Sequence, residues 1–273
     1  MSYATIMIYV DVANTLEQQV RLSVSLADKF NAMLIGLSAL AIRPPPVADV
    51  VIPEEIIEAD IKEMRAKLAQ KGSWFRDVAG AEHRKLEWRS MLDFPTEALA
   101  REARSADLVV IQRTKRPIDL YSSLDPGGAI LKIGRPTLVV PNEASSLHAK
   151  RVVIGWKDTR EARRVVQDAL PFLHETERVT ITEICQPGEE DLAQQHIDDV
   201  ARYLERHKIN SGPRIILHRK GSDAAQLIDL AQDEGADLLI TGAYGHSRLG
   251  EWIFGGMTRE LLVSCPIFCL MSH

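Results

Sequence analysis

Two short sequence patterns recur in this chain at the same separation, and this recurrence restricts the possible folds more than any other feature. Ala106-Asp-Leu108 returns as Ala236-Asp-Leu238, an offset of 130 residues (236 minus 106). Pro136–Val140 corresponds to Pro266–Leu270, again with an offset of 130 (266 minus 136). A repeat of this length is too long for a solenoid unit, so it predicts a chain built from two copies of one domain.

Short apolar runs alternate with segments of helical periodicity along both halves. Strands alternating with helices imply a parallel sheet covered on both faces. We therefore predict the α/β class, with two tandem doubly wound domains, each a five-stranded parallel sheet with helices on both faces. The predicted strands span 4–11, 32–40, 85–92, 107–111 and 136–141 in the first half, and 151–156, 179–185, 214–218, 237–240 and 266–271 in the second. The predicted helices include 16–30, 54–79, 95–105, 129–133, 190–208, 224–234 and 258–264.

The segment 142–150 is polar and rich in small residues, as is typical of a linker. It separates a predicted first domain, 1–142, from a predicted second domain, 150–273. The first helix of the second domain is predicted to begin at Asp158 as N-cap, with Glu161 as its capping-box partner. The apolar stripe of that helix consists of Ala162, Val165, Val166, Ala169, Leu170 and Leu173.

Composition excludes several classes of protein. The 273 residues are 45% hydrophobic and 26% charged, with a net charge of -5 and a pI of about 5.9. Such a chain lacks the field that draws proteins to nucleic acid or anionic membranes, so we expect neither partner. The stretch 261–271 is too short to span a bilayer, and the N-terminus has no secretory pattern, so we expect a cytoplasmic protein. Cys185, Cys265 and Cys269 have no metal-ligand spacing and are predicted to be buried thiols.

The segment 241–258 is the most informative for function. It directly follows the predicted fourth strand of the second half, where parallel sheets bind ligands. Gly242 and Gly245 allow the backbone to turn tightly. Gly255 and Gly256 precede the last helix, whose first amides form an anion site. Loop and helix start together predict a cradle for phosphates. The alternative is that these glycines serve only turns and helix packing.

The spacing Gly242-x2-Gly245-x9-Gly255 resembles the glycine pattern of the universal stress protein family. The resemblance covers the whole chain in element order, while the specific motif covers only the second half. It implies that the second domain binds ATP or a related nucleotide, with Mg²⁺ as a possible companion. Gly256 stands where ATP-binding members have Ser or Thr, and Thr258 is a candidate to compensate. The residues implied in nucleotide binding are Gly242, Tyr244, Gly245, Gly255, Gly256, Met257, Thr258, Gly155, Trp156 and Ile184.

The second half departs from the family pattern beside the expected nucleoside. ATP-binding members carry Asp at the end of strand one, where this chain has Lys157. Asp158 is one residue late and is better explained as a helix cap. Lys157 is either a phosphate partner or a solvated side chain. Ile184, at the end of strand two, would flank the base by the same comparison, and a core position is compatible with that role.

The first half has the complementary defect. Asp11 stands where the family places its Asp, but no glycine loop follows Ile111. Arg113, Lys115 and Arg116 offer positive charge there, although short basic loops are usually solvated. We therefore expect this domain to be degenerate, with Asp11 only a polar strand end.

No catalytic motif accompanies the glycine loop. The chain lacks a Walker lysine loop, an HExxH motif and a nucleophile elbow. His246 lies in the loop, either as a phosphate contact or as an exposed residue. Without a positioned base, fast phosphoryl transfer is not expected, although slow ATP hydrolysis stays open. As the resemblance to the universal stress protein family implies, the main expectation is a regulatory stress-response protein that binds a nucleotide and is not catalytic.

The resemblance also implies how the two domains associate. In this family the last strand mediates dimers by edge pairing, so Pro136–Val140 and Pro266–Leu270 are expected to pair within the chain. Such pairing covers two exposed sheet edges. A further homodimer is a possible higher assembly. Two other interpretations remain: an interaction module of the same fold that has lost nucleotide binding, and an ATP-using enzyme such as an adenylyl transferase.

Overall fold

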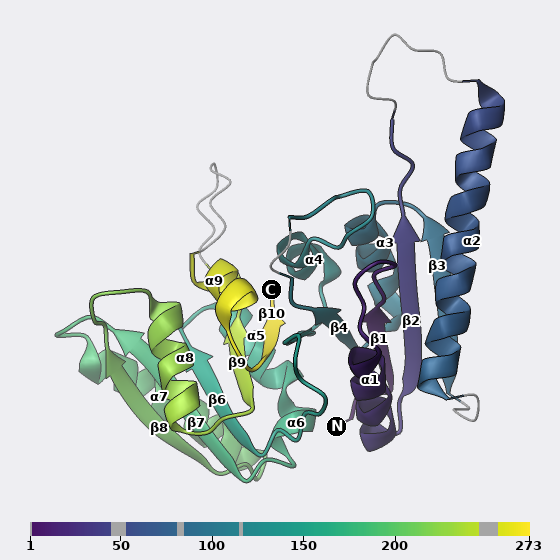
Figure 1. Cartoon of the computed structure of the whole chain (residues 1–273). Coiled ribbons are helices and arrows are strands. Elements are labelled where there is room, and N and C mark those ends of the chain that lie inside the picture. The colour runs from purple at the N-terminus through teal and green to yellow at the C-terminus, as the bar shows by residue number, and fades with distance from the viewer. Residues whose placement is uncertain (1, 45–52, 81–84, 115–116, 246–255) are drawn as a thin grey trace.

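The computed structural model describes residues 2–44, 53–80, 85–114, 117–245 and 256–273. The chain forms one ten-stranded sheet in the order β3-β2-β1-β4-β5-β10-β9-β6-β7-β8, with helices on both faces (Figure 1). Each half contributes five parallel strands. This confirms the predicted fold class. The domain bounds 1–142 and 150–273 stay a prediction.

The elements follow the predicted order, with small shifts at their ends. The first half consists of β1 (Thr5–Tyr9), α1 (Glu17–Phe30), β2 (Met33–Leu40), α2 (Glu54–Ala79), β3 (Leu86–Leu92), α3 (Pro95–Glu102), η1 (Ala103–Ser105), β4 (Leu108–Gln112), α4 (Pro126–Ile133) and β5 (Thr137–Val140). The second half consists of β6 (Arg151–Trp156), α5 (Arg160–Asp168), α6 (Leu170–Leu173), β7 (Arg178–Cys185), α7 (Glu190–Arg206), β8 (Ser211–Leu217), α8 (Asp223–Asp233), β9 (Leu238–Gly242), α9 (Gly256–Ser264) and β10 (Phe268–Ser272).

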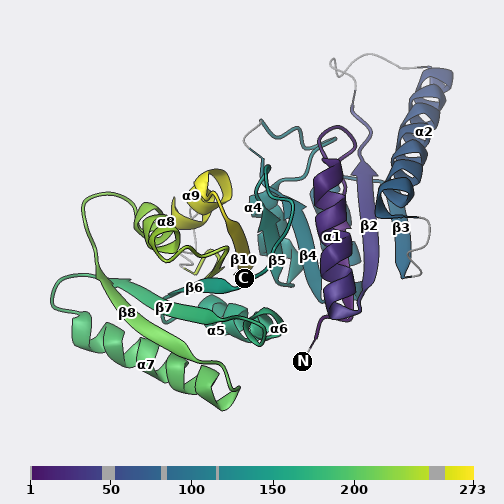
Figure 2. The same cartoon turned by 60° about the horizontal axis from the view of Figure 1, so that its bottom comes forward.

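The core consists of two apolar layers, because alternate strand residues point to opposite faces of the sheet. Ile6 and Ile8 of β1 pack into the layer that α1, α2, α5, α6 and α7 cover. Met7 and Tyr9 of the same strand pack into the layer under α3, α4, α8 and α9. Figure 2 shows the second half from below, with α5, α6 and α7 on one side of its strands and α8 and α9 on the other.

The repeated Ala-Asp-Leu pattern has the same local role in both halves. Asp107 accepts hydrogen bonds from the backbone amides of Ala4 and Thr5 at 2.8 and 3.0 Å. Asp237 accepts from the amides of Lys150 and Arg151 at 3.4 and 3.3 Å. In each half the aspartate directly precedes the fourth strand, and its carboxylate accepts hydrogen bonds from the amides at the start of the first strand.

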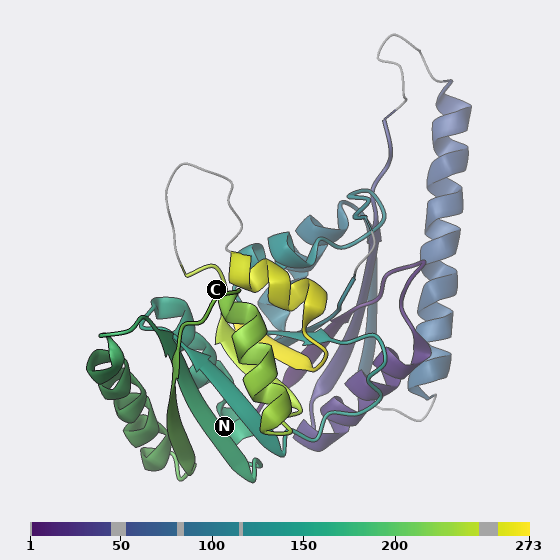
Figure 3. The ribbon, with the colours of Figure 1, turned by 60° about the vertical axis from the view of Figure 1, so that its left-hand side comes forward.

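The two halves meet at an antiparallel pairing of their last strands. Cys269 of β10 is paired with Val139 of β5, and Met271 with Thr137. The predicted intramolecular edge pairing is therefore confirmed. On one face of the seam Tyr3, Phe30 and Phe172 form an aromatic cluster with ring centroids 5.0 to 5.6 Å apart. On the other face α4 contacts α9, which lie beside each other in Figure 3.

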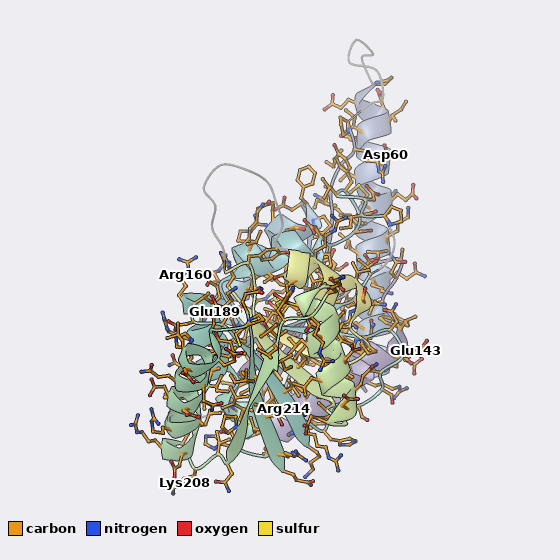
Figure 4. All side chains as sticks on the ribbon, turned by 90° about the vertical axis from the view of Figure 1, so that its left-hand side faces the viewer. Asp60, Glu143, Arg160, Glu189, Lys208 and Arg214 are labelled. Atoms are coloured by element: carbon orange, nitrogen blue, oxygen red, sulfur yellow. The ribbon has the colours of Figure 1, made fainter. Side chains whose placement is uncertain are left out.

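Helix α2 is buried only through its C-terminal half, where Leu68, Gly72, Phe75 and Ala79 contact the sheet layer. Its N-terminal half projects beyond the body of the protein, as the position of Asp60 shows (Figure 4). All three cysteines are buried and unpaired, as predicted. Among the described helices, none is both long enough and apolar enough to span a bilayer.

Candidate functional site

A cavity of about 280 Å³ lies at the carboxyl ends of β6 and β9. These strands are neighbours in the sheet, yet the chain leaves them toward opposite faces, to α5 after β6 and to α9 after β9. Such a point of divergence is where open parallel sheets bind ligands. The volume is close to the lower end of small-molecule sites, which run from about 300 to 1,000 Å³.

The structure brings the predicted site residues together on this cavity. Nine of them line its wall, whereas Gly255 and His246 lie outside the described residues. Those nine are Gly155, Trp156, Ile184, Gly242, Tyr244, Gly245, Gly256, Met257 and Thr258. Their roles as ligand contacts stay a prediction.

The two loop glycines are needed for packing rather than for an unusual backbone conformation. A Cβ on Gly242 would lie 2.7 Å from the Ala162 nitrogen and 2.9 Å from the Glu161 carbonyl carbon. A Cβ on Gly245 would lie 3.1 Å from the Thr159 hydroxyl. The residue with a left-handed backbone in this turn is Tyr244, with φ of 59°. The glycines therefore allow the start of α5 to approach the end of β9, in line with the packing alternative.

The turn after β9 is fixed onto the first turn of α9. The Tyr244 amide donates to the Thr258 hydroxyl at 3.1 Å, and Thr258 is 5% exposed. Thr258 thus supports the loop, a role that its sequence position alone did not indicate. Burial, followed by the charge of Asp125, raises the pKa of Tyr244 to about 12, so its phenol is neutral at physiological pH. The Gly245 amide has no acceptor among the described residues.

The start of α5 differs from the prediction. Thr159, not Asp158, is the N-cap, and its hydroxyl accepts from the Ala162 amide at 3.3 Å. Asp158 instead pairs with Arg163 at 2.6 Å. Glu161 is 4% exposed and accepts from Arg160, so it closes no capping box with Asp158. Burial alone would raise the pKa of Glu161, but the hydrogen bonds to its carboxylate, led by that of Arg160, hold the pKa below its usual value.

The apolar stripe after this cap is buried as predicted. The single predicted helix is divided, however, because α5 ends at Asp168 and α6 begins at Leu170, with Pro171 in its first turn. Proline lacks the amide that would continue the hydrogen-bond ladder of α5.

Two unpaired polar groups adjoin the cavity. Thr182 of β7 is 1% exposed, and its hydroxyl has no hydrogen-bond partner among the described residues. The indole N–H of Trp156 is likewise buried without a partner among the described residues, but the Trp156 side chain packs into the apolar layer on the other face of the sheet. Buried polar groups are normally paired, so the Thr182 hydroxyl is a candidate to bond a ligand. The sequence pattern identified Trp156 but missed Thr182, which lies beside Gly155 in the strand register.

Charged side chains of both signs line the cavity. Lys157 is exposed and contributes positive charge where ATP-binding family members have Asp. Asp223, which begins α8, contributes a carboxylate that pairs with His218 at 2.7 Å. No group of three or more His, Cys, Asp or Glu side chains that could hold a metal occurs among the residues with described positions.

A second cavity, of about 370 Å³, lies at the corresponding place in the first half, beyond β1 and β4. Asp11 and Arg113 line it, whereas Lys115 and Arg116 lie outside the described residues. Asp11 follows the end of β1 by two residues and belongs to the loop before α1, not to the strand. Asp11 is more than a polar strand end, because its carboxylate accepts hydrogen bonds from the amides of Ala13 and Asn14.

The universal stress protein family matches residues 148–273 of this chain. Among solved structures, the chain is similar to a universal stress protein from Archaeoglobus fulgidus, with a TM-score of 0.74 and 12% identity over 98% of this chain and 97% of that one. It is also similar to a functionally unknown protein from Pseudomonas aeruginosa, with a TM-score of 0.59 and 10% identity over 99% and 92% of the two chains. A search of curated proteins finds no match. The chain therefore contains a universal stress protein domain over residues 148–273, and its whole length has the fold of a fused two-domain universal stress protein.

Proposed function

We propose that the second-half cavity binds ATP or a related nucleotide and that this binding serves regulation in a stress response. The observation that carries the proposal is the position of α9, whose first turn forms the cavity wall beside the Tyr244–Gly245 turn. The first amides of a helix have no intrahelical acceptor, and the helix dipole adds positive potential there. This wall therefore suits negatively charged oxygens.

The remaining walls fit the other parts of a nucleotide. Gly155 and Ile184 provide an apolar surface for a base. The Thr182 hydroxyl provides a polar group without a partner in the described part of the chain. Lys157 provides a positive charge at the exposed rim, which would attract an anionic ligand toward the cavity. We assign the phosphates to the α9 side and the nucleoside to the β6–β7 side.

Slow turnover follows from the same arrangement. Fast phosphoryl transfer requires a positioned base and bound metal, and the described wall offers one carboxylate, Asp223, already paired with His218. We expect ATP turnover below about one per second, the low end of ordinary enzyme rates. A phosphate-release assay with excess ATP and Mg²⁺ measures this rate. Faster turnover would support the adenylyl-transferase class of interpretation instead.

The binding itself is testable by calorimetry. Titration of ATP into the native protein is expected to give saturable heat from a single site. Thr182→Val is expected to weaken ATP binding about five-fold, because it removes one hydrogen bond to the ligand worth roughly 1 kcal/mol. The same change costs the protein no internal hydrogen bond, so stability should be retained.

Thr180→Val is the matched control, since Thr180 lies two residues earlier on the same face of β7 and does not line the cavity. It should leave ATP affinity unchanged. Absence of heat with the native protein would overturn nucleotide binding. An equal loss of affinity in both variants would contradict the role of the Thr182 hydroxyl.

One observation favours the second candidate, an interaction module without a nucleotide. Close packing against the start of α5 already explains why positions 242 and 245 are glycines. The buried Glu161 carboxylate also lies beside Gly245. A negative charge there opposes an anion on that side of the cavity. The calorimetric result with the native protein distinguishes the two candidates. Homodimer formation stays a separate proposal, to be measured by light scattering.

A further inference from the structure

The first-half cavity has the position of a ligand site but not the chemistry of a phosphate cradle. It lies where β1 and β4, adjacent in the sheet, diverge toward α1 on one face and α4 on the other. This corresponds to the position of the second-half cavity between β6 and β9. Ligands bind at such points in open parallel sheets. The polar groups on the wall decide which ligand class fits.

The backbone amides of this cavity are already used within the protein. Ala13 and Asn14 donate their amides to Asp11 Oδ1 at 2.9 and 3.0 Å. The Thr15 amide donates to the Asp11 carbonyl at 3.3 Å, and the Leu16 amide donates to the Gln19 side chain at 3.4 Å. The loop that precedes α1 thus uses these amides within the loop itself and on Gln19, which leaves them unavailable to a bound anion.

The unpaired groups of the cavity can all accept hydrogen bonds. Thr15 is 7% exposed, and its hydroxyl oxygen has no partner among the described residues. The side-chain oxygen of Gln112 is also buried and unpaired, because Gln112 uses its amino group to reach Asn142 at 3.2 Å. Within the described part of the chain, no donor reaches Asp11 Oδ2. The ionised Asp11 carboxylate and the Gln112 amide oxygen can only accept hydrogen bonds, whereas the Thr15 hydroxyl can accept or donate, so a ligand that satisfies Asp11 and Gln112 must supply donors.

The Asp11 carboxylate is the anionic group of the described wall. Asp11 is half-buried and forms no ion pair with any described residue, although the charge of Lys71 in α2 acts on its carboxylate. Arg113 also lines the cavity and keeps its positive charge, but its guanidinium donates away from Asp11, across the seam, to the carbonyls of Leu262 and Ile267 at 3.2 and 3.3 Å. Tyr9 also lines the cavity, and its hydroxyl donates to the Ala39 carbonyl at 3.3 Å.

We propose that the first-half cavity binds a small primary amine as its ammonium ion. The ammonium group would donate to Asp11 Oδ2 and to the unpaired oxygens of Thr15 and Gln112. The two halves would then bind ligands of opposite charge at corresponding positions, an amine in the first and an anionic ligand in the second. The amine site does not depend on whether the second half binds a nucleotide.

Calorimetry with 1,4-diaminobutane tests this proposal, with 1,4-butanediol as an uncharged ligand of the same length. Saturable heat is expected with the diamine and none with the diol. Asp11→Asn should weaken diamine binding at least ten-fold, and it retains an acceptor for the loop amides. Asp60→Asn removes the same charge from the exposed, projecting part of α2 and should leave binding unchanged.

Thr15→Val provides a second variant that keeps the test decisive if Asp11→Asn fails to fold. It removes an unpaired hydroxyl and should weaken diamine binding several-fold without a lower melting temperature. Equal binding of diol and diamine, equal effects of Asp11→Asn and Asp60→Asn, or displacement of the diamine by inorganic phosphate would each overturn the amine site. An unchanged ATP titration in these variants separates this outcome from that of the second-half cavity.

Discussion

Replacing Gly242 with alanine is expected to lower the free energy of unfolding by about 3 kcal/mol, the upper end of the cost of overpacking a core. The added Cβ would lie 2.7 Å from the Ala162 nitrogen and 2.9 Å from the Glu161 carbonyl carbon. Both are backbone atoms in the first turn of α5, so no side-chain rotation can relieve the contact. The helix must move away from β9, and the cavity between them must change shape.

Urea denaturation measures this loss, and ATP titration should show weaker binding in the same variant. Gly256→Ala is the matched control, because it adds the same methyl group at the other end of the loop. A Cβ on Gly256 meets no atom of the described residues within 4 Å, and Gly256 begins α9. Its unfolding free energy should be unchanged or higher by up to about 1 kcal/mol, since alanine favours a helix over glycine. Equal stability of the two variants would contradict the packing role of Gly242.

Replacing Arg113 with methionine is expected to destabilise the protein by about 3 kcal/mol, because it leaves buried acceptors unpaired. Arg113 is 4% exposed and extends from the end of β4 into the other half. It donates to the Leu262 carbonyl at 3.2 Å, to the Ile267 carbonyl at 3.3 Å and to the Cys269 sulfur at 3.6 Å. Methionine fills similar space without these donors, and the relief of a buried charge offsets only part of the loss.

The control for this substitution is Arg202→Met. Arg202 is more than half exposed and pairs with Asp199 on the surface of α7. Exposed ion pairs contribute about 0 to 1 kcal/mol, so this variant should melt within a few degrees of the native protein. Differential scanning calorimetry of both variants measures the difference. Comparable melting temperatures would mean that Arg113 contributes little to the contact between the halves.

Arg113 also shows why the seam could be predicted only in part. The pairing of the last strands followed from the family resemblance and from the need to cover sheet edges. The sequence placed Arg113 in a short basic loop, where solvation is the usual outcome. In the fold its guanidinium instead donates to Leu262 and Ile267 near the end of α9. A contact between residues some 150 positions apart leaves no local signature, because neither segment shows a pattern that depends on the other.

The candidate site, like the seam, could be predicted from the sequence only in part. Position after the fourth strand and glycine spacing predicted six of the residues that line the cavity, and the family resemblance added Gly155, Trp156 and Ile184. The reason for Gly242 became visible only once α5 was in place beside β9, since the contacting atoms belong to another element. The sequence analysis missed Thr182, because the sequence of a strand does not show whether a threonine hydroxyl has a hydrogen-bond partner.

The sequence by itself determined the α/β class, the element order and the two halves, because these depend on periodicity and local turn chemistry that short segments carry. Only the tertiary structure decided that Thr159 rather than Asp158 caps α5, and that Asp11 occupies the amides of its own loop. Those outcomes depend on which donor and acceptor meet once the strands are aligned. Adjacent residues such as Asp158 and Thr159 have similar capping propensities, so the sequence cannot tell which one caps the helix until the positions of the strands are known.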